Sequence, residues 1–117
     1  MNVILFGAAG MVGDGVLIEC LDDPAVESVL VVGRRPCATT HPKLRELIRS
    51  DLFDYQDATD HFSNLDACFF CLGVSAVGMS EAAYHRVTHD LTVAAAESLM
   101  DLNPELTFCY VRMPFSA

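Results

Sequence analysis

The residues that most directly suggest chemistry are three glycines near the N-terminus, Gly7, Gly10 and Gly13. They follow a short apolar run typical of a strand and precede apolar residues at helical spacing. In such a turn the first glycine permits a tight bend, the second lets a pyrophosphate approach the backbone, and the third lets the helix pack on the sheet. The spacing therefore predicts a nucleotide site, with turn formation and packing alone as the alternative role.

A second candidate group stands at the end of the next apolar run, where Arg34 and Arg35 follow Gly33. A site that prefers NAD carries Asp or Glu about 20 residues after the glycine turn, where it binds the ribose hydroxyls. Guanidinium groups instead suit a 2′-phosphate, through charge-assisted and often bidentate contacts. The pair therefore predicts NADP over NAD, the alternative being two solvated surface arginines.

Two other pairs resemble redox or metal sites. Cys68 and Cys71 have the spacing of a redox or zinc motif, but they lie in an apolar run that reads as a strand, where positions three apart point to opposite faces. His85 and His89 lie four apart on a predicted helix, but Arg86 stands where a zinc protease carries Glu. We interpret the cysteines as core residues and the histidines as part of a solvated helical face.

The elements that would position these residues alternate between strand and helix. Residues 43–49 fit a helix as well as a strand, and we predict a third strand ending near Asp51 because it keeps the alternation intact. The other predicted strands are residues 3–6, 29–32, 67–72 and 106–111, and the predicted helices are residues 12–21, 55–65 and 80–103. This alternation predicts an α/β fold with a doubly wound parallel sheet in the order 3-2-1-4-5. A binding site is then expected at the carboxyl ends of strands 1 and 4, where the winding reverses.

Composition narrows the class of protein. The 117 residues carry a formal net charge of −9, which repels nucleic-acid backbones and anionic lipid. Hydrophobic residues make up 52% of the chain, enough for the core of one domain spanning residues 1–117. The longest uncharged stretch, residues 67–80, is shorter than the about 20 residues that span a bilayer. Five cysteines form no even disulfide framework, and we expect a cytoplasmic protein without nucleic-acid or membrane partners.

Taken together, these motifs resemble the atypical short-chain dehydrogenase/reductases, also described as NAD-dependent epimerase/dehydratase proteins. The resemblance runs over about residues 1–111, and it rests on residues 7–13, 33–35, 51–54, 66–73 and the helix over residues 84–99. It implies a Rossmann-like fold in which the glycine turn binds the pyrophosphate and the arginines bind the 2′-phosphate of NADP. By the same resemblance, Asp51 and Leu52 lie against the adenine, and Leu72 and Gly73 line the ribose and nicotinamide side. The implied cofactor-binding residues are Gly7, Ala9, Gly10, Met11, Val12, Gly13, Arg34, Arg35, Asp51, Leu52, Leu72 and Gly73.

The chain also departs from this family in its catalytic residues. The family uses a Tyr-x-x-x-Lys pair, in which the lysine lowers the pKa of the tyrosine for proton transfer during hydride transfer. Lys43 is the single lysine, and the residues four after the three tyrosines are Thr59, Thr88 and Pro114. We therefore expect no complete active site and a sheet truncated after its fifth strand.

Three interpretations of function follow. The chain is an NADP-binding domain without its own catalytic half, or a cofactor-free interaction module, or the cofactor half of an oxidoreductase that a partner chain completes. Truncation would leave one face of strands 4 and 5 and the edge at residues 108–111 bare. We therefore also predict a homo-oligomer formed through that face or edge.

Overall fold

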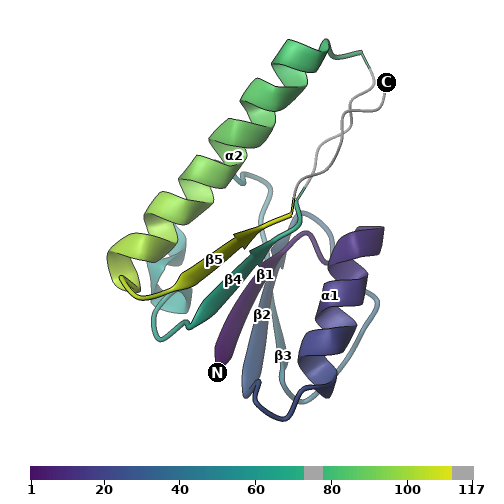
Figure 1. The fold of residues 1–117 in the computed structure, drawn as a ribbon, viewed down its shortest axis with the longest axis vertical. Coiled ribbons are helices and arrows are strands. Elements are labelled where there is room, and N and C mark those ends of the chain that lie inside the picture. The colour runs from purple at the N-terminus through teal and green to yellow at the C-terminus, as the bar shows by residue number, and fades with distance from the viewer. Residues whose placement is uncertain (73–77, 112–117) are drawn as a thin grey trace.

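Five parallel strands form one sheet in the order β3-β2-β1-β4-β5, as the sequence predicts. The structure is a computed structural model and describes residues 1–72 and 78–111. The strands are β1 (Asn2–Phe6), β2 (Ser28–Gly33), β3 (Leu44–Ile48), β4 (Ala67–Phe70) and β5 (Thr107–Tyr110). Two α-helices, α1 (Met11–Asp22) and α2 (Glu81–Leu102), and a 3-10 helix, η1 (Gln56–His61), connect them. The predicted α/β class and strand order are confirmed (Figure 1).

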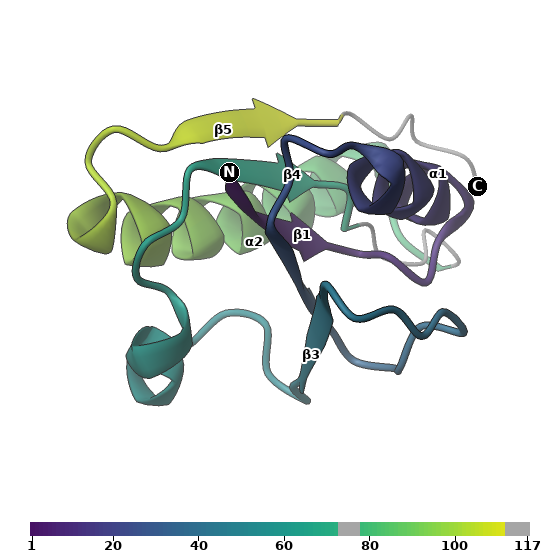
Figure 2. The same cartoon turned by 90° about the horizontal axis from the view of Figure 1, so that it is seen from below.

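The sheet carries a separate hydrophobic core on each face, because successive residues of each strand point in opposite directions. On the face covered by α2 and η1, called the α2 face, Ile4 and Phe6 of β1 pack with Leu91 of α2. On the opposite face, called the α1 face, Val3 of β1 packs with Leu17 of α1. Figure 2 shows α2 running alongside β4 and β5. The buried strands are therefore apolar on both sides, as expected for a parallel sheet between helices.

The longest helix, α2, begins and ends as the sequence predicts. Ser80 is its N-cap, and the Ser80 hydroxyl oxygen accepts a hydrogen bond from the backbone N–H of Ala83 at 3.1 Å. Its C-cap, Asn103, is buried and donates to the carbonyl oxygen of Phe62 at 2.6 Å, while its own side-chain oxygen accepts from the N–H of Leu65 at 2.9 Å. The first turns of α2 project beyond the carboxyl ends of the strands (Figure 1). Asn103 thus fixes the other end of this helix to the segment that leads into β4.

Three elements differ from the sequence prediction by more than one residue at an end. The helix expected over residues 55–65 is only the 3-10 helix η1, although Tyr55, Phe62 and Leu65 are buried as its apolar spacing indicates. Asn64 has a φ of 60°, a left-handed conformation that an α-helix does not contain, so a longer helix cannot form here. β3 ends at Ile48 rather than near residue 51, and β4 ends at residue 70 rather than 72.

The cysteine and histidine pairs lie where the sequence analysis places them. Cys68 belongs to the core on the α2 face and Cys71 to the core on the α1 face, so the two thiols diverge across the sheet. His85 and His89 are exposed on α2. Within residues 1–72 and 78–111, three or more His, Cys, Asp or Glu residues nowhere gather in a way that could hold a metal ion. Over the same ranges no helix has the length and apolar character needed to cross a membrane.

Candidate functional site

The glycine turn joins the carboxyl end of β1 to α1 at the place where the sheet reverses its winding. Gly7 has a φ of +88°, which L side chains rarely adopt, and its N–H donates to the carbonyl oxygen of Val32 on β2 at 3.2 Å. A Cβ at Gly7 would lie 2.7 Å from the carbonyl oxygen of Cys71, just after β4. The turn is therefore enclosed between the ends of β2 and β4, where only glycine fits.

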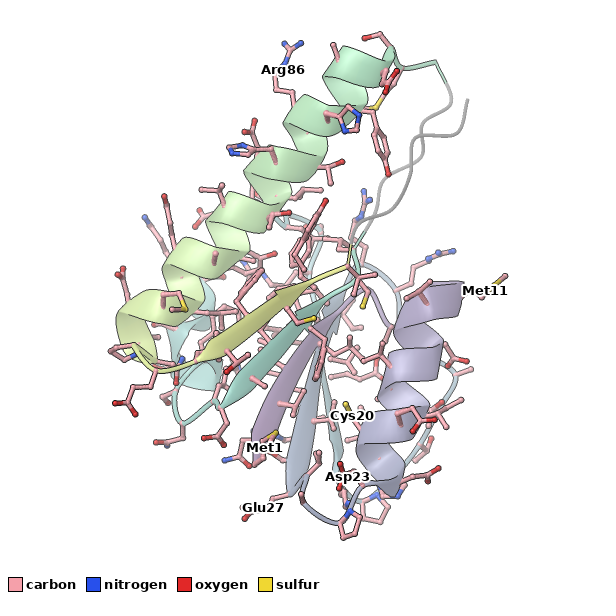
Figure 3. The ribbon with its side chains drawn as sticks, viewed as in Figure 1. Met1, Met11, Cys20, Asp23, Glu27 and Arg86 are labelled. Carbon is pink, nitrogen blue, oxygen red and sulfur yellow. The ribbon has the colours of Figure 1, made fainter. Side chains whose placement is uncertain are left out.

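Gly13 serves the packing of α1 against this turn. A Cβ at Gly13 would overlap the carbonyl oxygen of Gly7 and would lie 2.7 Å from its carbonyl carbon. Both atoms belong to the backbone, so neither can move aside as the end of a flexible side chain would. The third glycine thus lets the helix approach the turn closely, and Cys20 further along α1 points toward the sheet (Figure 3).

Gly10 is different, because the fold itself does not require a glycine there. It is exposed, has a φ of −82° and a ψ of 166°, and among the described residues a Cβ at this position would meet only the carbonyl oxygen of Gly7 at 3.7 Å. It is the N-cap of α1 and supplies no side-chain hydrogen bond to the first turn. Met11 is 93% exposed and projects outward from this end of the helix (Figure 3).

The first turn of α1 has the chemistry of an anion site. The first N–H groups of an α-helix have no acceptor within the helix, and the helix dipole places partial positive charge at this end. Ala9, Gly10, Met11 and Val12 are all exposed beside these groups. The open end of α1 thus combines free donors, partial positive charge and a position without a side chain, which is the arrangement that binds phosphate groups.

Arg34 and Arg35 stand on the neighbouring strand end, directly after β2. Both are exposed, and within the described residues neither guanidinium makes a hydrogen bond or an ion pair. The hydrogen bond from Gly7 N–H to Val32 places the end of β2 next to the glycine turn. Two uncommitted positive charges therefore lie at the same edge of the sheet as the open end of α1.

The remaining predicted site residues differ in exposure. Asp51 is exposed, and its side chain accepts a hydrogen bond from the N–H of Phe53 at 2.8 Å. The side chains of Leu52 and Leu72 belong to the core on the α2 face and are 4% and 9% exposed. Gly73 lies outside the described residues. The two leucines therefore contribute to packing with their side chains, whatever their backbone contacts.

A charged cluster around Arg49 lies just after β3, and the sequence analysis did not predict it. Arg49 Nη2 donates to Asp57 Oδ1 and to the carbonyl oxygen of Asp54, both at 2.7 Å, and the Arg49 guanidinium lies 5.6 Å from the ring centre of Tyr55. The hydrogen bond from Arg49 holds the pKa of Asp57 below its usual value, and burial raises the pKa of Tyr55. Arg49 therefore stabilises the segment after β3, and its charge is paired with that of Asp57.

Comparison with known proteins identifies the family of the chain. The family described as NAD dependent epimerase/dehydratase matches residues 3–111. The chain belongs to this family. This family member is 29% identical over 110 residues to the protein fmp52, mitochondrial, of Aspergillus fumigatus, and the match covers 86% of this chain and 45% of that protein. That name gives no support to a cytoplasmic location for the present chain, which stays a prediction.

Solved structures show the same fold. A short chain dehydrogenase family protein from Francisella tularensis has a TM-score of 0.69 at 15% identity, covering 93% of this chain and 49% of that one. Uronate dehydrogenase from Agrobacterium tumefaciens has a TM-score of 0.70 at 18% identity, covering 94% and 40%. A double mutant of DesIV, a dTDP-glucose 4,6-dehydratase from Streptomyces venezuelae solved with NAD bound, has a TM-score of 0.68 at 18% identity, covering 87% and 36%. The present family member spans less than half the length of each of these relatives.

The single lysine of this family member lies far from the glycine turn. Lys43 precedes β3, at the amino ends of the strands, whereas the turn lies at their carboxyl ends. Its ammonium group donates to the carbonyl oxygens of Leu21 and Asp23 at 3.2 and 3.1 Å. Lys43 therefore binds the last turn of α1 to the start of β3, and this location gives it a role in stability.

Proposed function

We propose that this chain binds NADP at the carboxyl end of its sheet. The pyrophosphate would lie on the first turn of α1, over Gly10, and the 2′-phosphate against Arg34 and Arg35. The observation that carries the proposal is the room at Gly10, where neither the φ angle nor a neighbouring atom of residues 1–72 and 78–111 demands a glycine. A ligand that must approach the backbone closely would explain why the residue at position 10 is a glycine.

The preference for NADP over NAD rests on charge. Arg34 and Arg35 are exposed and, among the described residues, uncommitted, so both can turn toward a phosphate. Asp51 is the acidic residue among the predicted cofactor-binding residues, and its side chain already accepts the N–H of Phe53. A 2′-phosphate therefore finds two donors here, whereas a plain ribose hydroxyl gains little from them.

We propose dinucleotide binding, without catalysis by these residues alone, as the function. The chain offers no Tyr-x-x-x-Lys pair, and its lysine is engaged at the opposite end of the sheet. Reduction or epimerisation of a substrate would therefore require groups contributed from outside this sequence, for example by a partner chain. Activity that appears only when such a partner is added would support this interpretation.

The test is thermal unfolding with millimolar NADPH or NADH. A ligand at 100 times its dissociation constant stabilises the native state by about 2.7 kcal/mol, which corresponds to roughly 10 °C for a domain of this size. We expect a larger rise with NADPH than with NADH, and loss of that difference in the double variant Arg34→Ala/Arg35→Ala. Absence of any rise with either nucleotide would refute the proposal.

Two glycines of the same helix end give a matched control. Gly10 and Gly15 are both exposed, and a methyl group fits at either position without a close contact. Gly10→Ala should remove nucleotide binding while the protein remains folded, because the methyl group occupies the approach path of the pyrophosphate. Gly15→Ala should bind as the parent protein does. Equal binding by both variants would contradict the assignment of Gly10.

A second candidate function is self-association through β5. Tyr110 on this edge strand is 43% exposed, Cys109 is exposed, and the strand carries no charged residue. The opposite edge, β3, is protected by the exposed charges of Arg45 and Glu46. We propose that β5 pairs with a second copy. Light scattering at several concentrations should give more than 12.7 kDa, and a monomer at every concentration would refute this.

A further inference from the structure

The two candidate 2′-phosphate ligands stand on a short bridge that is attached to β3 at both ends. At one end, the carbonyl oxygen of Gly33 accepts a hydrogen bond from the N–H of Arg49 at 2.9 Å. At the other end, Glu46 holds Cys37, since Oε2 accepts from the Cys37 N–H at 3.2 Å and Oε1 accepts from the Cys37 thiol at 3.3 Å. Residues 34–36 lie between these two attachments.

Glu46 is the unusual member of this arrangement, because an exposed glutamate on an edge strand would ordinarily extend into solvent. Here both of its carboxylate oxygens are occupied by Cys37, whose thiol also lies 3.7 Å from the carbonyl oxygen of Thr39. Burial raises the pKa of the Cys37 thiol, so it keeps the proton that it donates. Pro36 further restricts the bridge, because its ring fixes φ.

We propose that Glu46 is a positioning residue that orders the Arg34–Arg35 bridge and thereby sets the preference for NADP over NAD. The inference rests on the proposed NADP site. Its physical basis is conformational entropy: a flexible segment loses conformational freedom when the 2′-phosphate binds, whereas a bridge that is already ordered has little left to lose. NADH, which lacks that phosphate, gains little from the ordered arginines.

The sign of the effect separates positioning from simple electrostatics. Glu46 carries a negative charge close to the expected 2′-phosphate, so charge repulsion alone predicts that its removal strengthens NADPH binding. Positioning predicts the opposite. Glu46→Gln removes the charge but keeps an oxygen that can accept the Cys37 N–H, and should therefore retain most of the preference, whereas Glu46→Ala should lose it.

The experiment is titration of the full chain with NADPH and with NADH by calorimetry. For Glu46→Ala we expect the dissociation constant for NADPH to rise about tenfold, equivalent to 1.4 kcal/mol, and that for NADH to change less than twofold. Cys37→Ala removes only the thiol contact and should show a smaller rise. Glu97→Ala removes the same charge from an exposed position on α2 and should leave both constants unchanged.

The outcomes distinguish this inference from the proposed function. A parent protein that binds neither nucleotide refutes the NADP site, and the inference falls with it. A parent protein that prefers NADPH, together with a Glu46→Ala variant that keeps or increases this preference, refutes the positioning role alone. Amide hydrogen exchange provides a readout without ligand, since the Cys37 N–H should lose protection in Glu46→Ala. Unchanged protection there would also refute the tether.

Discussion

The sharpest test of the glycine turn compares alanine substitutions at two positions of the same helix. Gly13 and Gly15 lie two residues apart in α1, and both are glycines in a helical conformation. In an ordinary helix interior, replacing glycine by alanine stabilises the protein by about 1 kcal/mol. Any large difference between the two variants must therefore come from what surrounds each position.

The surroundings differ completely. A Cβ at Gly15 meets no atom of the described part of the chain within 4 Å, so Gly15→Ala should gain the full propensity term of about 1 kcal/mol. A Cβ at Gly13 would overlap the carbonyl oxygen of Gly7, which is rigid backbone. The helix must then move away from the turn and loosen the core around Leu17. Such overpacking costs about 1–3 kcal/mol and more where backbone must shift, so we expect a net loss of at least about 2 kcal/mol.

The assay is thermal and urea unfolding of the two variants beside the parent protein. A gap of about 3 kcal/mol between the variants corresponds to roughly 12 °C in midpoint for a domain of this size. Gly13→Ala should melt below the parent protein and Gly15→Ala slightly above it. A Gly13→Ala variant that is as stable as Gly15→Ala would refute the close approach of α1 to the turn on which the candidate site depends.

Two further predictions concern stability away from the site. Asn103→Ala should destabilise the protein by about 2–4 kcal/mol in urea unfolding, because it leaves the N–H of Leu65 and the carbonyl oxygen of Phe62 without their buried partner; a loss under 1 kcal/mol would contradict this. Burial raises the pKa of the Cys68 thiol, so above about pH 8.5, the ordinary thiol pKa, this group should lower stability by about 1.4 kcal/mol per pH unit, because the unfolded state loses a proton that the folded state retains. Burial also raises the pKa of the Cys20 and Cys71 thiols, which should add to this fall. Burial also raises the pKa of the Tyr55 hydroxyl, so stability should fall more steeply above about pH 10. Urea unfolding at a series of alkaline pH values checks both: constant stability from about pH 8.5 to pH 10 would contradict the Cys68 prediction, and an unchanged slope above about pH 10 would contradict the Tyr55 prediction.

Much of the fold follows from local patterns. The β1 run, the glycine turn and the periodicity of α1 identify a strand–turn–helix unit, and repetition of that alternation leaves few allowed sheet orders. The ends of α2 were also predictable, because Ser80 is a good N-cap and the residue after Asn103 is a proline. Hydrophobic periodicity and capping are properties of neighbouring residues, so one sequence is enough to reveal them.

The segment after β3 shows where local pattern is insufficient. The apolar spacing from Tyr55 to Leu65 indicates the buried face correctly but fits an α-helix as well as a 3-10 helix. The left-handed backbone at Asn64 and the bond from Arg49 to Asp57 decide between them. Neither feature can be recognised from the spacing of apolar residues, because both depend on how the segment leaves β3 and enters β4.

The sequence by itself determined the strand order, the place of the glycine turn at the reversal of winding, and the arrival of two arginines at the same edge, since each follows from spacing along the chain. Only the tertiary structure decided which glycine is free for a ligand. Gly7 and Gly13 are required by contacts with Cys71 and with each other, whereas no described residue lies close enough to Gly10 to require a glycine there. It also revealed that Glu46 holds the bridge bearing the arginines. The physical reason is that steric room and hydrogen-bond partners arise between segments brought together by folding, and such contacts have no fixed spacing in a sequence.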